Sequence, residues 1–267
     1  MVRLLMIPQL SALEECAAFA EQYQMGFEYN DFFNPQILDH AERTETLIHT
    51  YQRVKLPAYC TLHGAFFDVI PFSIDKKIRE VSALRIRQSI AAAKKIGASA
   101  VVFHTNYNPF LNTESYMESW VRQNIAFWKE ILEEEPQISI YLENMFDTSP
   151  DLLEQVSEAL SAYENYGVCL DYAHAAISPT PTQIWAEKLG RFVKHIHLND
   201  NDLKSDLHLA WGDGQIDRAA FYRLYETYLQ NADILLETSS LDNVKRSVET
   251  LIADGFLEPA VKHWQKS

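Results

Sequence analysis

A short apolar run alternates with a longer stretch of helical periodicity along the whole chain, and this alternation limits the available folds. The apolar runs are nearly continuous, which is typical of parallel strands buried on both faces. Eight strands are predicted: Leu4–Ile7, Gly26–Tyr29, Ala58–Leu62, Ala100–His104, Ile138–Glu143, Gly167–Asp171, Phe192–Leu198 and Ile234–Glu237. Strand-then-helix units spaced roughly 30 residues apart predict an α/β chain, a single (β/α)8 TIM barrel over residues 1–267. A doubly wound open sheet is the alternative, but no Gly-x-Gly-x-x-Gly loop follows any strand.

Helix-end signals lie between the predicted strands, as this alternation requires. A capping-box pattern at Ser11–Glu14 predicts the start of a helix that runs through Tyr23. Gly97 predicts the end of a helix over Ile78–Ile96. The sequence Ser149-Pro150-Asp151 places a capping residue, a first-turn proline and an acid in the order preferred at a helix start.

Composition narrows the classes of partner. The formal charge of −14 disfavours nucleic acid, because phosphate backbones are held by Lys and Arg. No run of about 18 apolar residues predicts a membrane span, and Pro8 interrupts the N-terminal apolar stretch too early for a signal peptide. Cys16, Cys60 and Cys169 share no Cys-x-x-Cys spacing and are expected to be reduced core residues of a cytoplasmic protein. The expected partner is a small molecule, and the oligomeric state is left open.

Polar side chains stand at the C-terminal ends of six consecutive predicted strands, where a barrel of this kind has its active site. Five histidines and four carboxylates fall there: His63, His104, Glu143, Asp171, His174, His197, Asp206, His208 and Glu237. Imidazole and carboxylate groups suit zinc, iron or manganese. Converging without an ion, the carboxylates would have raised pKa values. We therefore expect one to three divalent ions, zinc first, with manganese or iron as alternatives.

Other polar and aromatic residues receive weaker assignments. His195 lies on the same strand face as His197 but deeper, and is expected to support it. His40, His49 and His263 stand in helical or tail contexts and are expected to be structural. Loops 30–40, 107–113 and 146–149 are expected to determine specificity; their aromatics, Phe32, Phe33, Tyr107, Phe110 and Phe146, either stack on substrate or pack the rim. Lys204, Asn144 and Tyr107 are the predicted substrate contacts.

The segments "GVCLDYAHA", "HIHLNDND", "DLHLAWGDGQID" and "ILLET" resemble motifs of the xylose-isomerase-like TIM barrels, which comprise AP endonuclease family 2 and sugar phosphate isomerases and epimerases. By its ligands the chain is most similar to the endonuclease IV branch, and the match runs in order from His63 to Glu237. The resemblance implies three ions, usually zinc. It assigns His63 and His104 to the first ion. It makes Glu143 a bridge between this ion and a second one, which Asp171, His197 and Glu237 complete. It assigns His174, Asp206 and His208 to the third ion.

The sequence departs from that branch in the loops that would bind DNA. The loop after the second strand, "NDFFNPQILDH", contains no Arg or Lys, and Phe66 replaces a common tyrosine. The first strand lacks the usual histidine-containing start, and the loop between His197 and Asp206 is shorter. These departures and the acidic charge argue against DNA repair.

Four functions follow, in order. The first is a metal-dependent hydrolase that cleaves a phosphoester or phosphodiester in a small molecule, with Glu143 or Glu237 orienting hydroxide and Lys204 near phosphate. The alternative is a sugar or sugar-phosphate isomerase or epimerase with one manganese or zinc ion, in which Glu143 and Glu237 are both ligands and the acid/base pair. Apurinic-site endonuclease activity ranks below these, beside a non-catalytic metal-binding barrel.

Overall fold

The computed structural model describes residues 2–258 as a closed barrel of eight parallel strands. Each strand pairs with its neighbour in the chain, and β8 returns to pair with β1. The strands are β1 Leu4–Met6, β2 Gly26–Tyr29, β3 Cys60–His63, β4 Ala100–His104, β5 Ser139–Glu143, β6 Tyr166–Asp171, β7 Val193–Leu198 and β8 Asp233–Leu236. The predicted (β/α)8 barrel is confirmed. The largest difference lies in the third strand, which begins at Cys60 rather than Ala58, because pairing with β2 starts only there.

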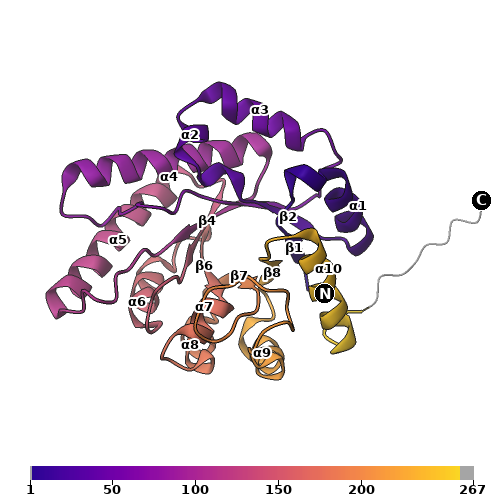
Figure 1. Ribbon diagram of the computed structural model, residues 1–267. Helices are drawn as coiled ribbons and strands as arrows, with labels where there is room; N and C mark the ends of the chain where they lie inside the picture. Colours follow the sequence, from indigo (N-terminus) through magenta and orange to yellow (C-terminus); the bar gives the residue numbers. More distant parts are fainter. Residues whose placement is uncertain (1, 259–267) are drawn as a thin grey trace, which may run out of the picture.

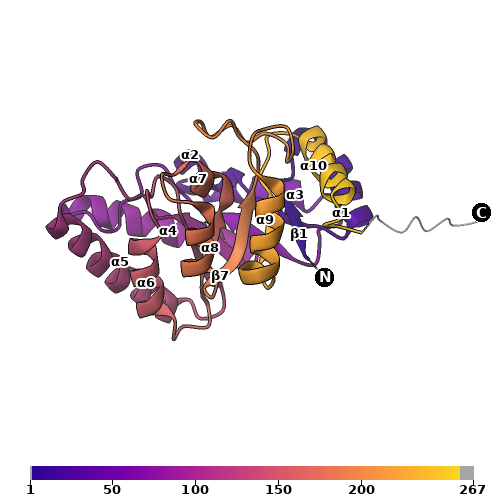
Figure 2. The same ribbon diagram turned by 90° about the horizontal axis from the view of Figure 1, so that it is seen from below.

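Helices surround the strands on the outside, as Figure 1 shows end-on and Figure 2 from the side. They are α1 Leu13–Tyr23, α2 Pro35–Leu38, α3 Ala41–Tyr51, α4 Lys76–Ile96, α5 Glu114–Glu134, α6 Asp151–Leu160, α7 Tyr172–Ile177, α8 Thr182–Leu189, α9 Arg218–Leu224 and α10 Leu241–Ala253. Two short 3-10 helices, η1 Leu10–Ala12 and η2 Asp31–Phe33, and a π-helix, η3 Tyr225–Leu229, complete the set. None of these helices combines the length and apolar character needed to cross a bilayer.

The predicted capping box before the first helix is wrong. Residues Leu10–Ala12 form a 3-10 turn, so α1 begins at Leu13 after Ala12, and no side chain caps it. The capping-box pattern does not form because Ser11 lies within this 3-10 turn, two residues before the helix begins. The predicted end of α4 is confirmed, since Gly97 adopts φ 84° there.

Two other helix starts differ from the predicted signals. Helix α4 begins at Lys76, before the predicted Ile78, because the Asp75 carboxylate accepts a hydrogen bond of 2.8 Å from the Lys77 N–H. Helix α6 begins at Asp151, and Pro150 is its N-cap, so no side chain caps this helix. The predicted cap at Ser149 is therefore wrong, although its hydroxyl accepts a hydrogen bond of 3.4 Å from the Asp151 N–H.

The core has two parts. A large apolar layer lies between barrel and helices and includes the fully buried Trp120, Trp185 and Trp211. A smaller cluster of Ala100, Val102, Tyr141 and Cys169 is separate from it. These four residues alternate along β4, β5 and β6 with residues of the large layer, which places them on the inward face of the barrel. The three cysteines are buried and free, as predicted.

One buried carboxylate organises the long loop at residues 199–217, which carries Asp206 and His208. Oδ1 of Asp200 accepts from the N–H groups of Asn201 (2.9 Å) and Ile216 (3.1 Å), and Oδ2 accepts from that of Gly212 (3.0 Å). The Asp200 backbone also pairs with Leu209 in an antiparallel bridge. Both ends of the loop are therefore tied to one residue at the end of β7.

We expect Asp200→Ala to destabilise the protein by about 2–4 kcal/mol, because three N–H groups lose a buried acceptor. Urea unfolding monitored by tryptophan fluorescence measures the change. Asp213→Ala in the same loop is the control, since its ion pair with Arg246 (2.7 Å) is exposed and contributes less than about 1 kcal/mol. Equal effects of the two substitutions would contradict this role of Asp200.

Candidate metal centre

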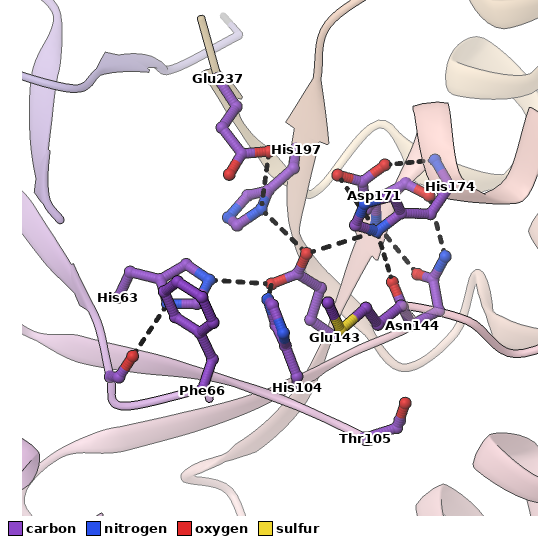
Figure 3. A network of polar contacts seen from close by, with 12 residues as sticks. His63, Phe66, His104, Thr105, Glu143, Asn144, Asp171, His174, His197 and Glu237 are labelled. Atoms are coloured by element: carbon purple, nitrogen blue, oxygen red, sulfur yellow. Dashed lines mark hydrogen bonds and ion pairs between the residues drawn. The ribbon is translucent and has the colours of Figure 1, made fainter. Parts of the chain in front are cut away.

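The nine predicted ligands gather at the end of the barrel where the strands finish. Glu143, Asp171 and His197 are almost completely buried at its axis, and His63 and Glu237 are also buried. Asp206 and His208 lie further out, with 40% and 33% of their side chains exposed. Figure 3 shows the inner groups pointing toward one another from β3 to β8. The centre thus has an inner part on the strands and an outer part on a loop.

Glu143 is the hub of the inner part. Its Oε2 atom lies 3.3 Å from Nε2 of His63 and 3.3 Å from Nε2 of His104. Its Oε1 atom lies 3.4 Å from Nδ1 of His197. Each carboxylate oxygen therefore faces a different set of donors, and Figure 3 shows dashed lines from Glu143 to His63, His104 and His197.

Two overlapping ligand groups share Glu143. One contains His63, His104 and Glu143, and the other contains Glu143, Asp171 and His197; within each, the ligand atoms lie within 4.8 Å of one another. Glu237 joins the second group, because its Oε2 atom is 3.4 Å from Nδ1 of His197. These are the first two groupings that the family resemblance implies.

The outer part is held together by Asp206. Its Oδ2 atom lies 3.3 Å from Nε2 of His174 and 3.0 Å from Nε2 of His208. His208 Nδ1 in turn lies 3.6 Å from Oε2 of Glu237, which connects the outer part to the inner one. The third implied group, His174, Asp206 and His208, is thus also brought together.

Backbone carbonyls orient three of the imidazoles. Nδ1 of His63 lies 3.0 Å from the carbonyl oxygen of Gly64, and Nδ1 of His174 lies 2.9 Å from that of Asn144. Nδ1 of His208 lies 3.2 Å from the carbonyl oxygen of Glu237. A carbonyl accepts only, so Nδ1 carries the proton and the Nε2 lone pair faces the centre. Imidazoles that bind metals are usually fixed in this way.

Asn144 positions Asp171. Its side-chain amide donates to the Asp171 carbonyl (2.9 Å) and accepts from the Asp171 N–H (3.0 Å). The Asp171 carboxylate then caps α7 by accepting from the His174 N–H (2.6 Å). Because both polar atoms of the Asn144 amide are used and the residue is buried, this geometry argues against the predicted substrate contact.

Electrostatics keep protons in the centre when no ion is bound. Burial raises the pKa of Asp171 to about 7, although the His174 charge opposes the rise. Burial lowers the pKa of His197 and His174, but surrounding acidic groups raise both well above the ordinary value: Cys169, Glu143 and Glu237 act on His197, and Asp171, Asp206 and Glu143 act on His174. The same balance raises the pKa of His208 to about 10. The imidazoles thus compensate the carboxylates with protons that an ion would replace.

The donor set fits a divalent ion. Oδ2 of Asp171 and Nδ1 of His197, which both face the other predicted ligands, are buried without an aligned hydrogen-bond partner. Such atoms are costly unless something binds them. Carboxylate and imidazole donors at this density are typical of zinc, iron or manganese sites. Ion identity and number remain predictions.

Sequence reasoning missed Glu28. This residue of β2 is 1% exposed, and its Oε1 atom lies 3.1 Å from Nε2 of His197, while Oε2 lies 3.0 Å from Nε2 of His195. Burial raises the pKa of Glu28, but the two imidazoles hold it well below the ordinary range. An acid within the apolar strand "GFEY" was the available signal. His195 lies below His197, as predicted, in contact with its ring (5.3 Å between centroids).

A cleft of about 910 Å³ opens beside the centre and reaches His174 and Asp206. Loops after β3, β4, β5 and β6 line it, and the predicted contacts Tyr107 and Lys204 are both in the lining. Phe110 and Phe146 also border it and are 91% and 62% exposed. Of the remaining loop aromatics, Phe32 is buried in the core and Phe33 packs on Phe66 (4.9 Å between centroids). Phe32 therefore belongs to the core, and Phe33 packs the rim.

The other histidines lie elsewhere. His49 is within α3 and His40 immediately precedes it, while His263 lies outside the described residues.

Sequence comparison identifies a family and two relatives. The model of a family described as the xylose isomerase-like TIM barrel matches residues 15–254. The uncharacterized protein MJ1311 of Methanocaldococcus jannaschii is 29% identical over 202 residues, which cover 71% of this chain and 68% of that protein. The uncharacterized protein MJ1614 of the same organism is 26% identical over 195 residues, covering 72% and 75%.

Solved structures share the fold. The TTHB071 protein from Thermus thermophilus, in a structure soaked with zinc chloride, has a TM-score of 0.76 at 24% identity and covers 97% of this chain and 100% of that one. A D-tagatose 3-epimerase-like protein has a TM-score of 0.73 at 23% identity, covering 93% and 96%. The 3-keto-D-glucoside 4-epimerase from E. coli has a TM-score of 0.68 at 13% identity, covering 96% and 100%. The endonuclease IV branch stays a prediction.

We expect the apparent affinity for zinc to increase with pH between about 6 and 8, by up to about tenfold per pH unit for each proton displaced. The reason is that Asp171, His174 and His197 have raised pKa values, so the metal-free centre holds protons that the ion must release. Isothermal titration calorimetry in buffers of different ionisation enthalpy measures both affinity and proton release. Binding that is independent of pH, with no proton release, would contradict this account.

Proposed function

The chain belongs to the xylose isomerase-like TIM barrel family, and on that basis we propose that it is a metal-dependent sugar isomerase or epimerase. The sequence alone ranked phosphoester hydrolysis first. Family membership now favours the alternative, and the epimerases among the similar structures support that order. The substrate we propose is a small sugar-like molecule.

The observation that carries the proposal is a pair of glutamates that converge on one nitrogen of one imidazole. Oε1 of Glu143 and Oε2 of Glu237 each lie 3.4 Å from Nδ1 of His197. In an epimerisation, one carboxylate removes the proton from the carbon next to the carbonyl. The other carboxylate then returns a proton to the opposite face, so the proton count is unchanged. In an isomerisation the proton returns to the neighbouring carbon instead.

Glu143, Asp171, His197 and Glu237 are the residues that would hold the ion in this proposal. A bound zinc or manganese ion supplies Lewis-acid polarisation of the substrate carbonyl and hydroxyl oxygens. His63 and His104 then orient Glu143 through its Oε2 atom, 3.3 Å from each imidazole. Asn144 orients Asp171 through its backbone.

The cleft beside the centre is the proposed substrate site. Its aromatic wall, with Phe66 and Tyr107 nearest the strand ends, excludes water and packs on the apolar face of a sugar ring. Three carboxylates line it, those of Asp68, Asp147 and Asp206, whereas Lys204 is the single lysine or arginine of the lining found in residues 2–258. This charge balance favours a neutral sugar over a sugar phosphate.

Hydrolysis of a small phosphoester is the second candidate, and one observation favours it. His174, Asp206 and His208 meet at distances of 3.3 and 3.0 Å, and a single-ion isomerase does not need them. Neighbouring ions held by inner and outer groups would stabilise the attacking and leaving oxygens of a displacement.

Proton transfer is the direct test of the first candidate. With manganese or zinc and a panel of neutral ketoses in D2O, we expect deuterium to enter at the carbon next to the carbonyl, detected by NMR. Glu237→Gln removes one member of the acid/base pair and is expected to slow exchange at least about 100-fold. Absence of exchange in the wild type across the panel would count against isomerase and epimerase chemistry.

Asp206→Ala separates the two candidates. It removes the group that joins His174 to His208, but it leaves the inner four residues intact. For an isomerase we expect exchange to stay within about threefold of wild type, whereas a multinuclear hydrolase would lose about 100-fold or more of its activity on bis-p-nitrophenyl phosphate. Asp213→Ala, an exposed residue of the same loop, is the matched control for both assays.

A further inference from the structure

A second layer of polar side chains lies inside the barrel, below the proposed metal centre. Glu28, Thr61, His195 and Cys169 are each no more than 1% exposed. They come from β2, β3, β7 and β6, so they face one another across the barrel axis. Such groups are costly to bury among apolar neighbours unless they bind one another, and none of them belongs to the nine ligands discussed above.

Glu28 is the centre of this layer. Its Oε2 atom accepts a hydrogen bond of 2.6 Å from the Thr61 hydroxyl and lies 3.0 Å from Nε2 of His195. Its Oε1 atom lies 3.1 Å from Nε2 of His197, a close contact in which the ring N–H is not aligned with the oxygen. The Thr61 hydrogen bond fixes the carboxylate so that Oε1 stays directed at His197.

His197 connects this layer to the metal centre, because its two ring nitrogens face opposite ways. Nε2 faces Glu28, whereas Nδ1 faces Glu143 and Glu237 at 3.4 Å each. His63, His174 and His208 present Nε2 to the centre and hold Nδ1 with a backbone carbonyl. His197 therefore presents Nδ1 rather than Nε2 to the centre. The Glu28 carboxylate lies at its other ring nitrogen, where each of the three other rings has a backbone carbonyl.

We propose that Glu28 is a positioning residue that keeps the proton of His197 on Nε2 and so directs the Nδ1 lone pair to the bound ion. The inference rests on the proposed metal centre. A carboxylate at 3.1 Å suits this task because it can accept a hydrogen bond from Nε2–H and has no proton to donate, so the tautomer with its proton on Nδ1 has no donor to its Nε2 lone pair. A carboxylate partner also increases the basicity of a metal-binding imidazole, and losing such a partner typically lowers metal affinity 10- to 100-fold.

The test compares zinc binding by wild type, Glu28→Gln and His195→Gln, measured by competition with a chromophoric chelator. Glu28→Gln keeps the size of the side chain but removes the acceptor charge, and we expect zinc to bind about 10- to 100-fold more weakly. His195→Gln disturbs the same buried layer and leaves the contact between Glu28 and His197, so its zinc affinity is expected to stay within about threefold of wild type. Circular dichroism of the metal-free proteins establishes that each is folded.

A second measurement uses only the wild type and so does not depend on folding of a variant. In protein labelled with 15N-histidine, zinc is expected to shift the Nδ1 resonance of His197, with Nε2 remaining protonated. A zinc-induced shift at Nε2 instead, or equal zinc affinity in wild type and Glu28→Gln, would overturn the proposal.

Two further outcomes are decisive. If His195→Gln loses one zinc per chain, the ion lies lower, among Cys169, His195 and His197, and the proposal is overturned. If the wild type binds neither zinc nor manganese, the metal centre and this inference fail together. Zinc binding that depends on Glu28, in a protein that shows no deuterium exchange into sugars, refutes the proposed function but supports the role of Glu28.

Discussion

The site depends on the burial of one ionised carboxylate, that of Glu143, at the axis of the barrel. Burying such a charge without partners would cost several kcal/mol. Nitrogens of His63, His104 and His197 lie 3.3–3.4 Å from its two oxygens and offset this cost. They belong to β3, β4 and β7, so a single side chain of β5 links strands from both sides of the barrel. The same imidazoles hold the Glu143 pKa well below its ordinary value against the effect of burial.

Strand register explains why most of the centre could be predicted from sequence. His104 pairs with Glu143 across β4 and β5, and Asp171 pairs with His197 across β6 and β7, so residues at or next to the ends of neighbouring strands lie side by side. A strand end is visible in sequence because an apolar run stops there. Glu28 was missed because it lies within a strand, and its meaning depends on which face of β2 points inward. That orientation is a property of the closed barrel, since every other residue of each strand faces the axis.

Supporting contacts are harder to predict than ligands for a similar reason. Asn144 immediately follows Glu143 and is a predicted substrate contact, yet its amide is matched to the backbone of Asp171 on the next strand. Nothing local to Asn144 distinguishes the two roles. The stretch "GVCLDYAHA" is the opposite case, because its chemistry is local: Asp171 ends β6 and caps α7, which places His174 three residues later beside the same centre.

The inner and outer ligands differ in what holds them, and this difference bears on how such a barrel changes its chemistry. Glu143, Asp171 and His197 are strand residues at most 1% exposed, and moving any of them would disturb the closed sheet. Asp206 and His208 belong to a loop that depends on Asp200, and both are partly exposed. Loops vary at little cost to the scaffold, whereas buried strands do not. The inner group can therefore be retained while loop substitutions add or remove the outer group. In the proposed isomerase or epimerase, proton transfer requires only the inner group, so the loop after β7 is the segment that would distinguish isomerisation from hydrolysis.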